Sequence, residues 1–440
     1  MRTNGFIWLA LSCGPALVRA CGGHDHDHPV RKWSQEELDE LERKWGAEFG
    51  FTGITTFAHL QYYKCLTTPS EPFDIGIIGA PFDTAVSYRP GARFGPRAIR
   101  AASARQTSFR GFNARAGFNP YQSWARILDC GDIPVSPFDN AVAIQQMTAA
   151  LTELGGRAPA VASDDGGEGS APSPPPAWWP KPKLITLGGD HSLSLPALRA
   201  LNAVYGQPIR VLHFDAHLDT WHPNKYPSHW ASEQASFNHG SMFWLAGREG
   251  LIVGGTGPNA TRGSGTKEDT RPSVHAGLRT RLSGSDFGDY EDDTAQNWVR
   301  IEADEVDDPD AAAGRGGVRG VTARILEALG TEDPVYLSVD IDVLDPAFAP
   351  GTGTPEPGGW TTRELIRVLR GLEGLNVVGA DVVEVAPAYQ GPGEETALAA
   401  AQVVYELLTS MVKRGVRDRE RAPAALGAGE KIGKGGRDEL

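Results

Sequence analysis

The sequence predicts an α/β protein in which helices cover both faces of a mostly parallel sheet. Three observations lead to this prediction. Short, nearly continuous apolar runs such as VYLSV at 335–339 are typical of strands that are buried on both faces. Longer stretches with amphipathic helical periodicity alternate with these runs. The 440 residues, 40% hydrophobic and 22% charged, have the balance of a globular chain with a large core.

The first predicted element is an amphipathic helix at 34–46, where Ser34 and Glu37 form a capping box. Strands are expected at 73–83, 125–135, 183–192, 209–217, 334–342 and 376–385, with a Gly-, Pro- and Arg-rich loop at 87–103. Helices are expected at 140–155, 194–206, 320–330, 361–372 and 394–415, and Thr361 and Glu364 form a second capping box. This alternation predicts one α/β domain over residues 51–415.

Two segments interrupt the alternation. Residues 155–182 are low in complexity and rich in proline, and residues 254–273 are similarly loop-like and contain an N-glycosylation sequon at Asn259. We expect both to be surface insertions in one domain. Residues 21–50 read as an arm with a His/Asp tract, GGHDHDHPV, followed by the helix, and residues 416–440 as a flexible charged tail.

Both ends of the chain carry targeting patterns. Residues 1–20 fit a secretory signal peptide, because Arg2 precedes an apolar stretch that is too short to span a membrane. The last four residues, RDEL, resemble a retrieval signal for the endoplasmic reticulum. The two patterns together predict a secretory-pathway protein, in the lumen of the endoplasmic reticulum or secreted, with no membrane segment after signal cleavage.

Charge and cysteine content narrow the function further. A formal net charge of −13 argues against nucleic acid and anionic membranes as partners and would suit a small cationic substrate. After loss of the signal, Cys21, Cys65 and Cys130 remain, which is not a disulfide framework. A Cys21–Cys65 pair is one option if the arm folds back, and the pairing stays open. No cysteine lies in a setting that would activate a catalytic thiol.

Three predicted strands end in side chains that can bind metal ions. The ends LITLGGDHS, VLHFDAHLD and VYLSVDID follow the same plan, with polar residues two positions apart on one face. In a parallel sheet these ends border the crevice where ligands bind. The side chains expected to converge there are His191, Asp215, His217, Asp219, Asp340 and Asp342.

The composition of this cluster indicates its metal. Four carboxylates in one small volume would repel each other strongly, and two divalent cations would cancel that charge. Oxygen and nitrogen donors without a thiolate favour ions such as Mn²⁺ over a structural zinc. Any single pair of aspartates could instead be a helix cap or a turn, but three such strand ends favour a metal site.

The motifs GGDHS, FDAHLDT and SVDIDVLDPAFAPGTGTPEPGG resemble the three signatures of the ureohydrolase family, which includes arginases and agmatinases. The similarity continues through GAPFDTAVSYRPGARFGPRAIRAAS, DCGDIPV and VVGADVVEVAP, and covers residues 70–412 apart from the two insertions. The resemblance implies a three-layer α/β/α fold, a homo-oligomer (trimer or hexamer) and hydrolysis of a linear guanidino compound.

The resemblance also implies two Mn²⁺ ions per subunit. One would be held by His191, Asp215, Asp219 and Asp340, and the other by Asp215, His217, Asp340 and Asp342, with Asp215 and Asp340 as bridges. Asp219 would pass a proton to the departing amine. His239, in FNHGSMF, would relay protons, unless it is a packed core histidine, and Glu384, in GADVVEV, would pair with the substrate guanidinium. Asp381 is expected to be structural.

The sequence is most similar to the agmatinase branch. Trp221 stands two positions after Asp219, where arginases carry an asparagine that holds the α-carboxylate of arginine. We therefore expect hydrolysis of agmatine to putrescine and urea, a reaction of polyamine metabolism. The alternatives are guanidinobutyrate or another ω-guanidino acid, and a non-catalytic metal-binding homologue. Deacetylase chemistry on a related fold uses a single zinc, whereas this chain supplies ligands for two ions.

Six further residues have open roles. Arg89, Arg93 and Arg97 are expected to be structural, with binding of a substrate carboxylate as the alternative. His213 is expected to be a packed histidine. His222 and His229 lie between the second signature and His239 and are expected to be ordinary loop histidines, with a role in specificity as the alternative.

Overall fold

The computed structural model describes residues 32–47, 49–162, 174–225, 230, 232–255, 271–308 and 316–422. The chain divides into a short segment, 1–48, and a large unit, 49–440. In the short segment, helix α1 (Gln35–Trp45) begins with the predicted capping box of Ser34 and Glu37. The signal peptide, the His/Asp tract, Cys21, His229, Asn259 and the RDEL terminus lie outside the described residues.

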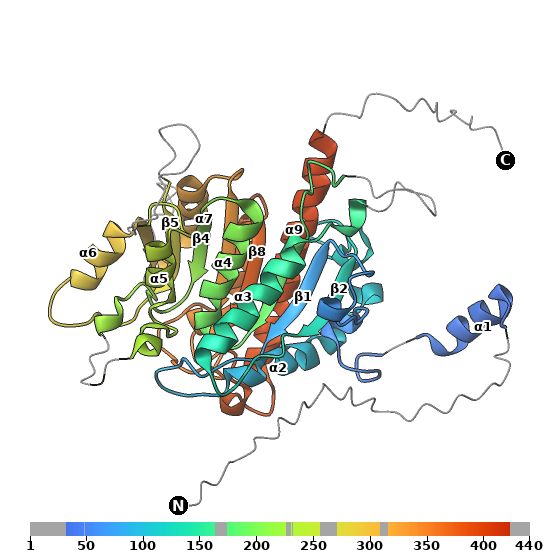
Figure 1. Ribbon diagram of the computed structural model, residues 1–440, viewed down its shortest axis with the longest axis horizontal. Helices are drawn as coiled ribbons and strands as arrows, with labels where there is room; N and C mark the ends of the chain where they lie inside the picture. The colour runs from blue at the N-terminus through green and yellow to red at the C-terminus, as the bar shows by residue number, and fades with distance from the viewer. Residues whose placement is uncertain are drawn as a thin grey trace, which may run out of the picture. The chain divides into compact units, whose positions relative to one another are not determined.

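The large unit contains one eight-stranded sheet (Figure 1). Its strands are β1 (Ile75–Ala80), β2 (Ile127–Asp132), β3 (Lys183–Gly188), β4 (Arg210–Phe214), β5 (Ser273–Leu278), β6 (Trp298–Glu302), β7 (Pro334–Asp340) and β8 (Asn376–Val383). The order is β2-β1-β3-β8-β7-β4-β5-β6, and every neighbouring pair is parallel. The predicted parallel sheet is confirmed. Strands β5 and β6 were not expected, because both carry polar residues.

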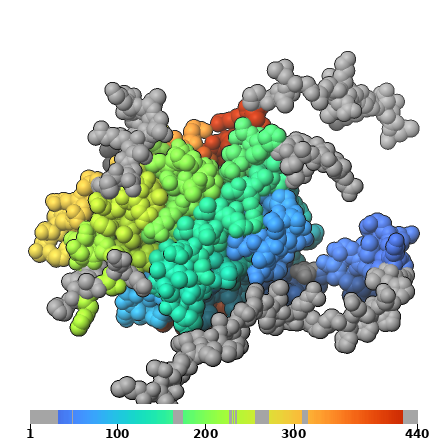
Figure 2. Space-filling model, in the orientation of Figure 1, coloured from blue at the N-terminus to red at the C-terminus, as the bar shows by residue number. Residues whose placement is uncertain are grey.

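Helices cover both faces, as predicted. One face carries α2 (Gly95–Ala102), α7 (Gly317–Leu329), α8 (Thr362–Gly371) and α9 (Glu395–Arg421). The other carries α3 (Asn140–Gly156), α4 (Ser194–Tyr205) and α5 (Met242–Glu249), which form a continuous surface (Figure 2). Each face has its own hydrophobic core. Helix α6 (Gly288–Ala295) lies beside β6 at the end of the sheet. Together these elements form the three-layer α/β/α arrangement.

Three local expectations differ from the structure. Residues 87–103, expected as a loop, include α2, which starts with a proline in its first turn. The insertion at 155–182 is not all surface, because Trp179 is fully buried and packs against Trp124 at 4.7 Å. Helix α9 runs to Arg421, past the residue where the flexible tail was expected to begin.

The structure also pairs two cysteines. Cys65 and Cys130, both buried, form a disulfide that ties the segment before β1 to strand β2. The Cys21–Cys65 option is therefore wrong, and proximity within the folded unit decides the pairing. Among the described residues, none of the helices has the length and apolar character that crossing a bilayer requires.

Candidate metal centre

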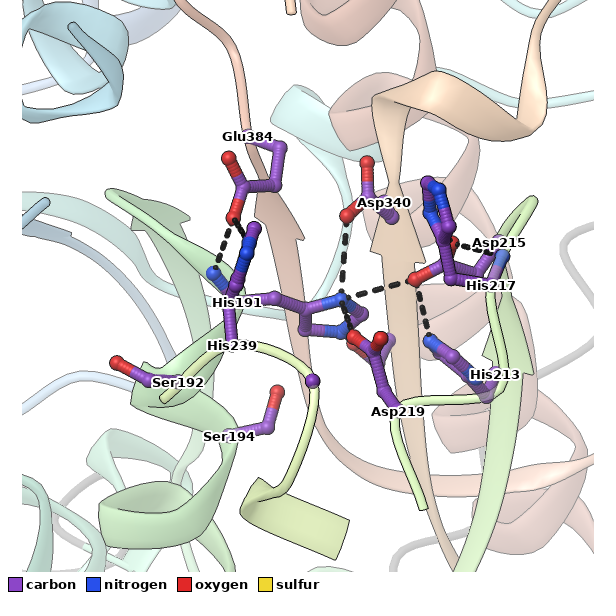
Figure 3. A network of polar contacts seen from close by, with 12 residues as sticks. His191, Ser192, Ser194, His213, Asp215, His217, Asp219, His239, Asp340 and Glu384 are labelled. Atoms are coloured by element: carbon purple, nitrogen blue, oxygen red, sulfur yellow. Dashed lines mark hydrogen bonds and ion pairs between the residues drawn. The ribbon is translucent and has the colours of Figure 1, made fainter. Parts of the chain in front are cut away.

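The candidate site lies at the carboxyl ends of four adjacent strands in the middle of the sheet, β3, β8, β7 and β4. His191 follows β3, Glu384 follows β8, Asp340 ends β7 and Asp215 follows β4 (Figure 3). All four side chains are buried. Because the carboxyl ends of parallel strands lie at the same edge of a sheet, polar side chains from distant parts of the sequence come together there.

A first cluster surrounds one ring nitrogen of His191. Its Nδ1 atom lies 3.1 Å from Asp215 Oδ2, 3.1 Å from Asp219 Oδ2 and 3.2 Å from Asp340 Oδ2 (Figure 3). One nitrogen and three carboxylate oxygens therefore converge on one small volume.

The hydrogen bonds of His191 show which nitrogen can bind a cation. Its Nε2 lies 2.7 Å from Ser338 Oγ, and that hydroxyl donates to Asp381 Oδ1 at 2.7 Å. Because the serine proton is used, Nε2 must carry the ring proton and donate. Nδ1 is then left with its lone pair towards three carboxylates, and it has no hydrogen-bond partner among the described residues. A cation between these four atoms satisfies all of them.

A second cluster shares Asp215 with the first. His217 Nδ1 lies 3.0 Å from Asp215 Oδ1 and 3.2 Å from Asp342 Oδ2. Asp215 thus presents Oδ2 to the first cluster and Oδ1 to the second, the arrangement of a carboxylate that bridges two ions. Asp340 Oδ1 instead accepts a hydrogen bond from the backbone of Asp342 at 2.9 Å, so the second bridge remains a prediction.

The charges of the two clusters demand compensation. Burial, followed by repulsion from Asp342 and Asp215, raises the pKa of Asp340 well above its usual range. Burial and the charge of Asp215 raise the pKa of Asp342 to about 6. Burial opposes the charged form of His191, but its contacts with three carboxylates raise its pKa well above the usual value. The negative charge of these carboxylates must therefore be compensated, either by bound cations or by protons.

The backbone is unusual at two site residues. Asp219 and Glu384 have φ of 55° and 59°, the left-handed region that residues other than glycine rarely adopt. Glu384 is held there by a hydrogen bond from its N–H to Gly189 O at 2.9 Å. A side chain at Gly189 would collide with Phe82 O, which explains the second glycine of GGDHS. Such strained residues persist where the surrounding structure fixes them.

Glu384 and His239 form a contacting pair on the other side of His191. Glu384 Oε1 accepts from the His191 backbone at 2.8 Å and contacts His239 Nδ1 at 3.1 Å, whereas its buried Oε2 has no partner among the described residues. The Ser87 backbone donates to His239 Nε2 at 2.9 Å, and the Ser87 hydroxyl lies 2.7 Å from the same atom. Burial opposes protonation of His239, but Glu384 raises its pKa to about 9.

A cavity of about 120 Å³ opens beside the clusters. Its lining includes Ser87, His217, Asp219, Trp221, His239, Asp340 and Thr354. The indole Nε1 of Trp221 donates to Asp289 Oδ2 on α6 at 3.0 Å, which fixes the ring in the wall. The structure therefore brings all eight predicted site residues to one place, and Ser87 and Thr354 join them.

The residues with open roles are also placed. Arg93 pairs with Asp83, and Arg89 lies between the rings of Tyr88 and Tyr389, so these two have structural contacts. Arg97 is exposed on α2. His222 packs against Trp244 with ring centroids 4.5 Å apart. None of these four residues belongs to the cavity lining.

Asp381 and His213 are both buried next to residues of the site. Asp381 is structural, as expected, because it accepts from Ser194, Ser338 and Tyr336. His213 does more than pack: its Nε2 lies 2.8 Å from Asp215 Oδ2. Its neighbour His275 was missed, although the two histidines occupy paired positions on β4 and β5.

The comparisons with known proteins agree with this geometry. Residues 73–409 match the model of the arginase family. The chain is 45% identical over 373 residues to putative agmatinase 1 of Schizosaccharomyces pombe, covering 84% of this chain and 85% of the relative. It is 36% identical over 369 residues to the agmatinase of Chromobacterium violaceum, with 83% and 91% covered.

Two solved structures are similar over most of their length. Proclavaminate amidinohydrolase from Streptomyces clavuligerus has a TM-score of 0.63 and 32% identity, covering 83% of this chain and 100% of that chain. A hypothetical agmatinase from Burkholderia thailandensis has a TM-score of 0.61 and 32% identity, covering 84% and 93%.

Proposed function

The chain belongs to the arginase family, and from this premise we propose that it hydrolyses agmatine to putrescine and urea with two manganese ions. The observation that carries the proposal is Asp215, whose two oxygens face two separate clusters of ligand atoms. Relatives that are named agmatinases and share 36–45% of its residues support the substrate. Donors that are only oxygen and imidazole nitrogen support manganese.

The proposed ligands of the first ion are His191, Asp215, Asp219 and Asp340, and those of the second are Asp215, His217, Asp340 and Asp342. Bound there, two divalent ions would supply a hydroxide nucleophile at neutral pH. The substrate guanidinium is a stabilised cation that needs both this nucleophile and a fixed orientation.

The protein groups around the centre can orient the substrate and move protons. Glu384 Oε2, buried without a partner among the described residues, would accept the N–H groups of a guanidinium. Asp219 lines the same cavity and can carry a proton to the departing amine. His239 connects Glu384 with Ser87, so it can exchange protons between the cavity and its rim.

The far end of the substrate decides between agmatine and its competitors. Among the residues that the structure describes, the cavity lining contains no arginine or lysine that could hold a carboxylate, and the ring of Trp221 forms part of its wall. This supports a substrate that ends in an amine. A second candidate is another guanidino compound, since proclavaminate amidinohydrolase is 37% identical over 355 residues. A non-catalytic role is disfavoured by the presence of Glu384 and His239 in contact.

Urea release from the purified, manganese-loaded protein tests this proposal. Agmatine, 4-guanidinobutyrate and arginine are offered in parallel, with Asp215→Asn as the control. We expect urea from agmatine and none from the variant. Urea from 4-guanidinobutyrate alone would keep the mechanism and replace the substrate. No urea from any of the three, with two Mn²⁺ bound, would support the non-catalytic alternative.

We further propose that the protein works as a homo-oligomer, a trimer or hexamer, in the secretory pathway. The Cys65–Cys130 disulfide supports an oxidising compartment. Expression in a eukaryotic cell tests the location: we expect an N-terminus near residue 21, retention in the endoplasmic reticulum, and release into the medium when residues 437–440 are deleted. The mass of the native protein in solution tests the assembly.

A further inference from the structure

A chain of buried side chains leads from Asp215 away from the cavity. His213 Nε2 lies 2.8 Å from Asp215 Oδ2, and His213 Nδ1 lies 2.7 Å from His275 Nδ1. His275 Nε2 lies 3.1 Å from Asp293 Oδ1 on α6. All four side chains are fully buried. The proposed chemistry uses only Asp215, so the other three need an explanation of their own.

The hydrogen bonds determine the protonation of these four side chains. The two ionised carboxylates only accept, so each outer Nε2 must carry a proton, and the bond between the two Nδ1 atoms holds a third. Three protons on two imidazole rings give one positive charge. That charge is shared by two rings that lie between the carboxylates of Asp215 and Asp293. Both nitrogens of His213 are then occupied, and neither is free to bind a metal ion.

Asp293 has a second connection to the site. It accepts from the Thr220 hydroxyl at 2.7 Å, and Thr220 follows the left-handed residue Asp219. Gln296, which caps the same helix, donates to Thr220 O at 3.1 Å. One carboxylate on α6 therefore contacts the histidine pair that leads to Asp215 and also the side-chain hydroxyl of the residue after Asp219.

A path for protons would need a titrating group beyond Asp293, and the described partners of its carboxylate other than His275 are Thr220 and Arg300. Beyond His275, the other oxygen of Asp293 accepts from Arg300 Nη1 at 2.8 Å. Arginine keeps its protons at any physiological pH, so the chain ends in a fixed cation. This arrangement holds geometry and charge in place instead of moving protons.

We propose that Asp293 is a positioning residue of the metal centre: it orients Asp215 through His275 and His213, and holds the backbone of Asp219 through Thr220. The inference rests on the proposed two-metal centre. Partners that orient the ligands of a metal ion typically contribute about 10- to 100-fold to its affinity. Asp293 acts on two ligands at once, although it contacts neither.

The first test is the affinity of the metal-free, full-length protein for Mn²⁺, measured by calorimetric titration. Asp293→Asn keeps the shape of the side chain and removes its charge. We expect its dissociation constant to rise about 10-fold or more. The matched control is Glu406→Gln, another buried carboxylate paired with an arginine, Arg370 on α8, and remote from the site. The control should lose stability and keep its affinity for Mn²⁺.

A second variant isolates the histidine arm. His275→Phe retains the stacking on Trp298, whose ring centroid lies 4.0 Å away, and breaks the contact with His213. Asp293 keeps Thr220 and Arg300 in this variant. We expect weaker binding of Mn²⁺ again, and this result decides the question if Asp293→Asn does not fold.

The outcomes separate this inference from the proposed function. A wild-type protein that binds Mn²⁺ but releases no urea overturns the function, while weaker binding in the variants still supports the role of Asp293. A wild-type protein that releases urea, with variants whose dissociation constants stay within about twofold of it, overturns the role of Asp293. A wild-type chain that binds no Mn²⁺ overturns both.

Discussion

The ends of strands β7 and β4 carry similar aspartates but are built in different ways. At the end of β7, Asp340 accepts from the backbone of Asp342 and caps a short turn, Ile341–Val343, so this end starts from a local motif. At the end of β4, Asp219 is left-handed, its carbonyl accepts from Phe243 N at 3.2 Å, and the next residue is tied to α6.

The difference separates local from long-range control of a metal site. The β7 end starts from a common local motif, an aspartate that caps the turn after it. Distant residues such as Arg279 and Thr354 then add contacts to Asp342. The β4 end depends on residues more than 70 positions away along the chain, such as Asp293, 73 positions from Thr220. The β8 end, where left-handed Glu384 is held by Gly189 O, is of the second kind.

The largest effect is expected at the β8 end. Glu384→Gln removes the charge that would meet the substrate guanidinium, and loss of one member of a buried charge pair costs about 2–5 kcal/mol. We therefore expect kcat/KM for agmatine to fall about 100-fold or more, with two Mn²⁺ still bound per chain. Steady-state urea release and metal analysis of the same preparation check this. Loss of the metal together with activity would show that Glu384 supports the ligands instead of the substrate.

The sign of a stability change should distinguish the β7 and β4 ends in the metal-free protein. The folded-state pKa of Asp342, about 6, is raised above its unfolded value. Ionisation of this carboxyl therefore destabilises the fold as the pH rises from the unfolded pKa to about 6. Asp342→Asn should therefore raise the free energy of unfolding at pH 7 by at most about 3 kcal/mol. Above pH 7 the difference between variant and wild type should stay nearly constant.

The corresponding change at β4 should act in the opposite direction. Burial opposes ionisation of Asp215, but its contacts with three histidines, His213 first, hold its pKa well below the usual value. Asp215→Asn should therefore destabilise the metal-free protein at pH 7. Both variants should bind Mn²⁺ far more weakly than the wild type. Denaturant unfolding of both variants, with and without Mn²⁺, measures these changes against the wild type. Stability changes of the same sign in the two metal-free variants would contradict the expected difference between the β7 and β4 ends.

The same contrast explains how much the sequence reveals. The apolar runs predict six of the eight strands, and the capping boxes at Ser34 and Thr361 occur as predicted because they are local. The eight predicted site residues lie in short motifs, and the fold brings them together. Asp293 and His275 were not predicted, because no local pattern distinguishes them. Asp293 lies in an acidic helix, α6, and His275 lies in β5, whose sequence did not indicate a strand.

The smallest effect concerns His239, which contacts Glu384 at the β8 end. Its folded-state pKa of about 9 is raised above the unfolded value of about 6.5, so the pair stabilises the fold fully below pH 6.5 and loses this contribution as the pH rises through 9. The two values set a ceiling of about 3 kcal/mol. The Ser87 backbone N–H, which donates to Nε2, favours the neutral ring and reduces the effect to about 1–2 kcal/mol.

Unfolding of the metal-free protein by denaturant between pH 6 and pH 10 measures this contribution. His239→Asn serves as the reference, because every other titrating group is common to both chains. The difference in free energy between wild type and variant should shrink as the pH rises through 9. A difference that stays constant over this range would mean that the ring is neutral throughout and that the Ser87 N–H decides its state. The β8 end would then be held by neutral hydrogen bonds, with Glu384 alone carrying the charge that a guanidinium could meet.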